Sequence, residues 1–113
     1  MRILGIIPAR GGSKGIPRTN LADVCGRPLI AWSIEVGKQL LANAVLARCI
    51  VSTDDEEIAA VARAYGADVP FLRPAAAATD TAKALDYVLH ALDTLEPRDG
   101  DYDAVMILQP TSP

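Results

Sequence analysis

The chain repeats one pattern, in which a short apolar segment is followed by a longer segment with helical periodicity. Residues 3–7 read Ile-Leu-Gly-Ile-Ile, and residues 104–108 read Ala-Val-Met-Ile-Leu. Residues 3–7 do not alternate with polar residues, as a strand with one face in water does, so they predict a strand buried on both faces, and residues 104–108 predict a further strand. Two further strands are predicted over residues 48–53 and 68–72, the latter shortened by Pro70.

Two helices are predicted from signals at their ends. The first runs from residue 29 to about 42, because the proline that precedes it suits the start of a helix. The second follows the acidic residues 54–57, which interact favourably with the positive end of a helix. We expect Thr53 or Asp54 to cap it and Gly66 to end it.

A third helix is predicted over residues 81–95, followed by a turn at Pro97 and Gly100. Its inward residues are expected to be Leu85, Val88, Leu89 and Leu92. Asp99, Asp101 and Asp103 have part of the spacing of a calcium loop, but its glycine and terminal glutamate are absent, so we expect a solvated turn.

The resulting order, β-α-β-α-β-α-β, predicts an α/β fold with right-handed crossovers and a Rossmann-like, doubly wound, mostly parallel sheet. No linker or internal repeat divides residues 1–113, so one domain is expected. If the strand order reverses after the third strand, the fourth strand lies beside the first. The crevice between their carboxyl ends is then the expected ligand site.

Composition excludes several classes of protein. Half of the residues are hydrophobic, which excludes wholesale disorder, and the net charge of -3 argues against a nucleic-acid binder. Apolar runs are too short to span a bilayer and no full signal-peptide pattern is present, so we expect a cytoplasmic protein with no membrane partner. Cys25 and Cys49 are expected to be reduced thiols, and His90 and Trp32 packing or surface residues.

The loop after the first strand concentrates cations and glycines. Arg10, Lys14 and Arg18 occur there with no carboxylate, although the chain as a whole is acidic. Glycines let backbone N–H groups approach a ligand, and the cations suit phosphates. Neither the P-loop spacing nor the dinucleotide fingerprint fits, because Gly15 is followed by Ile16 and the glycines at 11, 12 and 15 are wrongly spaced. A solvated basic turn is the less favoured alternative.

An ordered set of segments resembles the acylneuraminate cytidylyltransferases, the CMP-sialic acid synthetases, and specifically their N-terminal half. The matching segments are IPARGGSKGIP at 7–17, GRPLI at 26–30, VSTDDEEIA at 51–59, VPFLRP at 69–74, ATDTA at 78–82 and LQPTSP at 108–113. The resemblance implies an incomplete fold of the nucleotide-diphospho-sugar transferase type. It also implies that a nine-carbon 2-keto sugar acid such as sialic acid is activated with CTP, giving a CMP-sugar and pyrophosphate.

The resemblance also implies residue roles. Arg10 and Lys14 would stabilise the leaving pyrophosphate as the catalytic cations. The nucleotide-binding residues would be Ala9, Arg10, Gly11, Gly12, Ser13, Lys14, Asn20, Arg73 and Gln109. Arg73 would lie near the base and Gln109 between nucleotide and sugar. Mg²⁺ would be required, with its ligands outside this chain, and the full-length protein would be a homodimer.

Departures from the family leave nucleotide preference open. Thr19 stands where a lysine is usual, with Arg18 a possible substitute, and Lys83 and Ala84 replace two serines. The alternatives are a non-catalytic nucleotide-binding module or inactive fragment, and a cytidylyltransferase for legionaminic, pseudaminic or another 2-keto sugar acid. Because family members are about twice as long, we expect residues 1–113 alone to bind CTP weakly without turnover.

Overall fold

The computed structural model describes residues 1–9, 23–24, 27–72 and 84–109. The elements are β1 (Ile3–Ala9), β2 (Asp23–Val24), β3 (Arg27–Pro28), α1 (Leu29–Ala42), β4 (Arg48–Thr53), α2 (Glu56–Ala64), α3 (Ala84–Asp99) and β5 (Ala104–Ile107). The predicted order of strands and helices is confirmed except for the predicted strand over residues 68–72. The two-residue antiparallel pair β2–β3 was not predicted.

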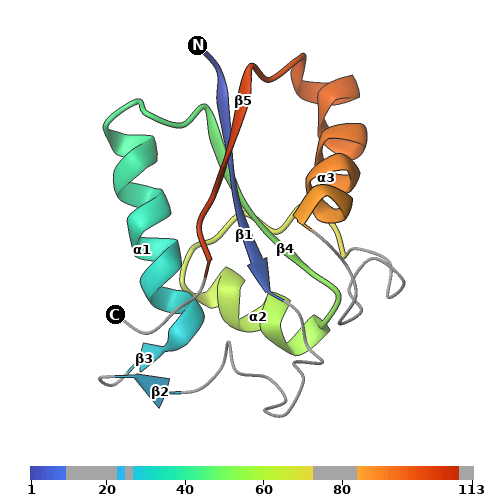
Figure 1. The fold of residues 1–113 in the computed structure, drawn as a ribbon. Helices are drawn as coiled ribbons and strands as arrows, with labels where there is room; N and C mark the ends of the chain where they lie inside the picture. The colour runs from blue at the N-terminus through green and yellow to red at the C-terminus, as the bar shows by residue number, and fades with distance from the viewer. Residues whose placement is uncertain (10–22, 25–26, 73–83, 110–113) are drawn as a thin grey trace.

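The main sheet has the order β4-β1-β5, and both pairings are parallel (Figure 1). Ile6 of β1 lies opposite Ile50 of β4 and Ile107 of β5. The last strand therefore lies beside the first, as the reversal of strand order predicts. In parallel sheets the connecting helices bury both faces, which accounts for the unbroken apolar runs.

The predicted strand over residues 68–72 forms only in part. Two isolated parallel bridges, Ile50 to Asp68 and Thr53 to Leu72, place the segment along the outer edge of β4. Pro70 lies between them, and proline has no N–H to donate to a ladder. The segment therefore follows the expected direction without becoming a regular strand.

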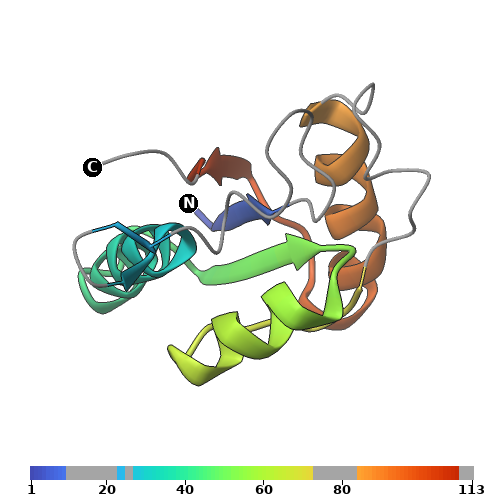
Figure 2. The same ribbon diagram turned by 90° about the horizontal axis from the view of Figure 1, so that it is seen from below.

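Helices cover the two faces of the sheet, with α1 and α2 on one and α3 on the other (Figure 2). Between the sheet and the first pair of helices lies a core that includes Ile7, Ile34, Val51 and Ile58. The core beneath α3 contains Leu4, Ile6, Ile50, Tyr87, Ala91 and Leu95. Within the described residues, no helix is long and apolar enough to cross a membrane.

The cap of α2 is Asp55, so the prediction of Thr53 or Asp54 was wrong by one or two residues. Asp55 Oδ1 accepts hydrogen bonds from the backbone N–H groups of Glu57 and Ile58, at 2.8 and 3.2 Å. Thr53 instead stays in β4, where its hydroxyl oxygen accepts from the Asp55 N–H at 3.1 Å. Gly66 follows the helix with φ of 85°, a left-handed conformation that favours glycine.

Helix α3 differs from the predicted helix in where it ends and in which residues face the sheet. It continues through Pro97 to Asp99, and only then does Gly100, with φ of 85°, end it by donating to Glu96 O at 2.9 Å. Its fully inward residues are Tyr87, Ala91 and Leu95, with Val88 and Leu92 partly buried. Leu89, predicted to be inward, is 47% exposed, because the small Ala91 rather than a leucine lies against the sheet.

At the amino-terminal edge of the sheet, Arg48 joins three segments of the chain. Its guanidinium donates to Asp68 Oδ2 and to Asp99 Oδ2, each at 2.8 Å. Asp99 also accepts from the Tyr102 hydroxyl, and Arg2 donates its backbone N–H to Asp103 at 2.7 Å. The turn expected to be only solvated is therefore tied to β1 and β4.

Hydrogen bonds from Tyr102 and Arg48 lower the pKa of Asp99. The folded protein thus favours the ionised form of Asp99. Ionised Asp99 stabilises the fold at pH values above the pKa of this carboxyl in the unfolded chain, and the stabilisation is lost as the pH falls through its lower pKa in the folded chain. We expect Asp99→Asn to lower the thermal midpoint by a few degrees at pH 7. The difference from wild type should shrink below about pH 4, near the usual range of an aspartate.

Circular dichroism melts between pH 2.5 and 7 measure this effect. Asp93→Asn, on the exposed side of the same helix, is the matched control and should behave like wild type. If the thermal midpoints of Asp99→Asn and wild type differed by the same amount at every pH, the stabilisation could not come from the ionisation of Asp99.

Candidate functional site

The carboxyl ends of the strands gather at one edge of the sheet. Ala9 ends β1 and lies opposite Thr53, which ends β4. Ala9 and Thr53 are both buried, so the strands are packed among other residues up to this edge. In open α/β sheets ligands bind outside this edge, where the strand order reverses, which here is between β1 and β5.

The segment that leaves β5 is held against β1 and α1. Leu108 N donates to Ile6 O at 2.9 Å, which extends the pairing one residue beyond β5. The hydroxyl of Ser33 donates to the backbone oxygen of Gln109 at 3.4 Å. Gln109 itself is exposed, so its side chain is accessible at the edge where the ligand site is expected.

Ser33 is a site residue that sequence reasoning missed. It lies in α1 between Ile30 and Ile34, and all three are buried. A polar residue within the apolar face of a helix was the available signal, since a buried hydroxyl requires a hydrogen-bond partner. Its partner, 76 residues away in the sequence, is evident only in the folded chain.

The amino-terminal end of α2 lies at the same edge. Glu56 and Glu57 occupy its first turn, and Asp55 caps it. The prediction that this acidic cluster serves a helix terminus rather than a metal is supported by these backbone hydrogen bonds. Across the described ranges no three His, Cys, Asp or Glu side chains are grouped so that they could hold a metal ion.

Two of the predicted site residues, Ala9 and Gln109, belong to the described structure; Ala9 ends β1, and Gln109 follows Leu108, which pairs with Ile6 of β1. Leu72, directly before Arg73 in the sequence, is bridged to Thr53 at the same edge. The other predicted residues lie outside the described ones; these are Arg10, Gly11, Gly12, Ser13, Lys14, Arg18, Asn20 and Arg73.

His90 is a packing residue, as predicted. Its ring meets Phe71 edge-on, with the ring centroids 4.8 Å apart. This contact joins α3 to the segment alongside β4, on the face opposite α1. Trp32 is partly exposed on α1.

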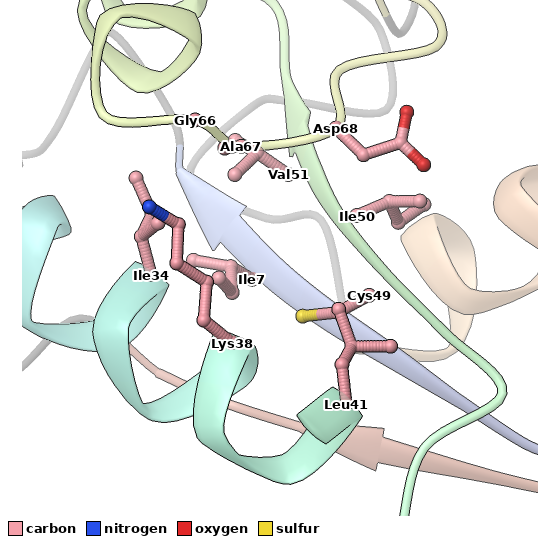
Figure 3. A pocket seen from close by; sticks show the side chains of 10 residues that line it. All are labelled: Ile7, Ile34, Lys38, Leu41, Cys49, Ile50, Val51, Gly66, Ala67 and Asp68. Atoms are coloured by element: carbon pink, nitrogen blue, oxygen red, sulfur yellow. The ribbon is translucent and has the colours of Figure 1, made fainter. Parts of the chain in front are cut away.

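A separate hollow opens between α1 and the Gly66–Asp68 segment, toward the other end of β4 (Figure 3). It encloses about 320 Å³, part of it open to solvent, and its walls are mainly apolar. Cys49 lies in its floor, and Lys38 extends along the α1 side. Burial raises the pKa of the Cys49 thiol to about 11, so the thiol stays protonated near neutral pH and is a poor nucleophile.

Comparisons with known proteins identify related sequences and a related fold. A family model described as "Cytidylyltransferase" matches residues 4–110. The chain is 44% identical over 113 residues to the CMP-N,N'-diacetyllegionaminic acid synthase of Legionella pneumophila, and 41% identical over 112 residues to the N-acylneuraminate cytidylyltransferase of Escherichia coli. These alignments cover 100% and 99% of this chain.

A solved structure has a similar fold. It is CMP:2-keto-3-deoxy-manno-octonic acid synthetase complexed with CTP, with a TM-score of 0.75 and 25% identity. The match covers 97% of this chain and 40% of that one. The chain likewise spans 47% of the Legionella protein and 25% of the Escherichia coli protein, so it corresponds to less than half of each relative.

The close packing of Gly37 in α1 against Cys49 in β4 leads to a testable prediction. A Cβ at Gly37 would lie 2.7 Å from Cys49 Sγ, so the sulfur would have to shift. We expect Gly37→Ala to destabilise the wild type, although alanine in a helix is ordinarily better than glycine by about 1 kcal/mol. In a Cys49→Ala background, the same change should be neutral or stabilising.

Urea unfolding of the four proteins in this double-mutant cycle measures the coupling between the two positions. Residues in contact usually couple by about 0.5–3 kcal/mol, and we expect a value in that range. Equal effects of Gly37→Ala in both backgrounds would show that the sulfur does not restrict position 37.

Proposed function

This chain belongs to the cytidylyltransferase family, and we propose on that premise that it is the nucleotide-binding half of a longer transferase domain. The proposed reaction joins CTP and a nonulosonic acid, either an N-acylneuraminate or a related acid, to give a CMP-sugar and pyrophosphate. The observation that carries the proposal is that β5 pairs with β1 in parallel, so that the carboxyl ends of the two strands lie at the same edge of the sheet. Both segments that resemble the family most, after Ala9 and around Gln109, leave the sheet there.

The proposed chemistry is in-line nucleotidyl transfer. The anomeric hydroxyl of the sugar acid attacks the α-phosphorus of CTP, its proton leaves, and the bond to pyrophosphate breaks. Such a reaction depends mainly on alignment of the two substrates and on stabilisation of phosphate charge. We assign the charge stabilisation to Arg10 and Lys14.

Further contacts to the nucleotide are proposed for the same loop and for the neighbouring segments. Backbone groups of Gly11 and Gly12 lie against the triphosphate in this proposal, because glycine allows close approach. Ser13 binds a phosphate, Asn20 the nucleoside and Arg73 the base. Arg18 supplies the positive charge that a lysine usually provides in the family at the position of Thr19.

Gln109 is proposed to mark the boundary between the nucleotide and the sugar acid. Support comes from its exposed position and from the anchoring of its backbone oxygen by Ser33. A side chain on an anchored backbone is pre-organised, so less conformational entropy is lost when it binds.

The remaining parts of the proposal extend beyond the described residues. We propose a Mg²⁺ requirement, because divalent ions commonly neutralise the charge that develops in phosphoryl transfer. We also propose a homodimer for the full-length protein and a cytoplasmic location.

The sugar acid is the least constrained part of the proposed function. The named relatives act on diacetyllegionaminic acid, N-acylneuraminate and 2-keto-3-deoxy-manno-octonic acid. Identity is 44% and 41% to the first two, against 38% to the 3-deoxy-manno-octulosonate cytidylyltransferase of Brucella ovis, which favours a nonulosonic acid. Pseudaminic acid remains within this class, because a Campylobacter jejuni enzyme with that substrate is 44% identical.

Calorimetric titration with CTP tests the nucleotide site. We expect Lys14→Ala to weaken CTP binding at least 10-fold, since a charge-assisted hydrogen bond contributes about 1.5–3 kcal/mol. Lys38→Ala is the matched control, because Lys38 lies at the hollow beside α1, away from the carboxyl edge. Equal affinities of wild type and Lys14→Ala would remove Lys14 from the site.

Pyrophosphate release separates an enzyme from a binding module. The assay supplies CTP, Mg²⁺ and N-acetylneuraminate or diacetyllegionaminate to a protein that contains this chain together with a C-terminal half. Release that depends on both the sugar acid and Lys14 supports the transferase. CTP binding without release under any of these conditions would favour the non-catalytic module.

A further inference from the structure

The segment that follows β5 is held by helix α1 as well as by β1. Leu108 donates its N–H to Ile6 O of β1 at 2.9 Å. The Ser33 hydroxyl of α1 donates to Gln109 O at 3.4 Å. Leu108 also approaches α1 at Gly37, where a Cβ would lie 3.7 Å from Leu108 Cδ1. Two consecutive residues after the strand are therefore in contact with one helix.

The two α1 residues that meet this segment share one face of the helix. Ser33 and Gly37 are four residues apart, which places one above the other on an α-helix. Ile30 and Ile34, on either side of Ser33 in the sequence, are buried in the core between α1 and the sheet. The Ser33 hydroxyl is thus presented by a helix whose position is fixed by core packing, which holds a group more precisely than a loop does.

Serine is an unfavourable residue for this buried helical position unless its hydroxyl is used. Alanine forms helices better than serine, and a buried hydroxyl without a partner destabilises the folded state. The bond from Ser33 to Gln109 spans 76 residues of sequence. The hydroxyl therefore fixes the position of a distant segment rather than only satisfying its own helix.

Gln109 gains much of its order from this contact. β5 ends at Ile107, and the last backbone hydrogen bond that the described residues of this segment make to β1 is donated by Leu108. Pro110 follows in the sequence, and a proline disfavours the helical conformation for the residue before it. Because Ser33 fixes the direction of the Gln109 carbonyl, it also fixes the backbone from which the Gln109 side chain projects.

We infer that Ser33 is a positioning residue for the proposed transfer reaction, in which it holds Gln109 toward the sugar acid. The inference rests on the proposed function, which places Gln109 between the nucleotide and the sugar acid. The Gln109 amide is uncharged and offers both donors and an acceptor, which suits the hydroxyl and carboxylate groups of a sugar acid. Phosphates are assigned instead to the cations of the loop after β1.

The length of the contact agrees with a role that develops when substrate binds. An O–H···O bond usually measures about 2.5–3.0 Å, and hydrogen bonds that support catalysis are often long in the free enzyme and shorten in the complex. Loss of the Ser33 hydroxyl should therefore affect use of the sugar acid and leave CTP binding unchanged.

Steady-state kinetics of pyrophosphate release test the inference, in a protein that contains this chain together with a C-terminal half. The sugar acid is N-acetylneuraminate or diacetyllegionaminate. We expect Ser33→Ala to lower kcat/KM for the sugar acid about 5- to 10-fold, the usual effect of one hydrogen bond between uncharged groups. The Kd for CTP, measured by calorimetry, should stay within twofold of wild type.

Two comparisons separate the hydroxyl from the packing of α1. Ser33→Thr keeps the hydroxyl and should retain most of the wild-type kcat/KM, whereas Ser33→Val has nearly the same shape as threonine and should lose as much as Ser33→Ala. This pair applies even if alanine disturbs the fold. Gln39→Ala, at an exposed polar position of the same helix, is the matched control and should behave like wild type.

A double-mutant cycle shows whether Ser33 acts through Gln109. Residues that act through each other have non-additive effects. In a Gln109→Ala background the side chain to be positioned is absent, so Ser33→Ala should then change kcat/KM by less than twofold.

Equal losses from Ser33→Ala in both backgrounds would overturn the inference and leave the proposed function intact. So would equal activities of Ser33→Thr and Ser33→Val, or a loss of CTP affinity as large as the loss of kcat/KM. A wild type that binds CTP but releases no pyrophosphate would refute the proposed transferase, and the inference with it.

Discussion

The pairing of β1 with a parallel strand on each side organises the rest of this molecule. From Leu4 to Ala9 the strand is buried, and its backbone groups are shared between β4 and β5. Because the two neighbours are far apart in the sequence, the crossovers must pass over the faces of the sheet, where α1, α2 and α3 cover it. The carboxyl end of β1 at Ala9 and the exit of β5 toward Gln109 thereby lie at the same edge of the sheet.

The two ends of the sheet have different roles. At the amino-terminal end, Arg48 and its carboxylate partners hold β4, α3 and the segment beside β4 together. These groups are charged and already paired with each other, so they hold the fold rather than a ligand. At the carboxyl end, helix α2 begins and Gln109 is exposed.

Local signals were sufficient where a residue acts through its own backbone or its near neighbours. The bounds of α1 and β4 agree with prediction, because Pro28 and the run of β-branched residues act locally. Local signals failed where packing decides between similar residues. Leu89 and Ala91 both suit a helix, and only the close approach of the sheet selects Ala91 for the inward side. The same holds for Pro70, which interrupts a segment that the sheet still aligns.

The sequence by itself determined the fold class, the cytidylyltransferase family and the order of strands and helices apart from the segment at residues 68–72. These follow from apolar periodicity and from short motifs, both of which involve residues close together in the sequence. Only the tertiary structure decided that Ser33 holds Gln109 and that Arg48 joins Asp68 to Asp99. Each of these features depends on groups far apart in the sequence, and their distance and direction are set only when the sheet and its helices pack together.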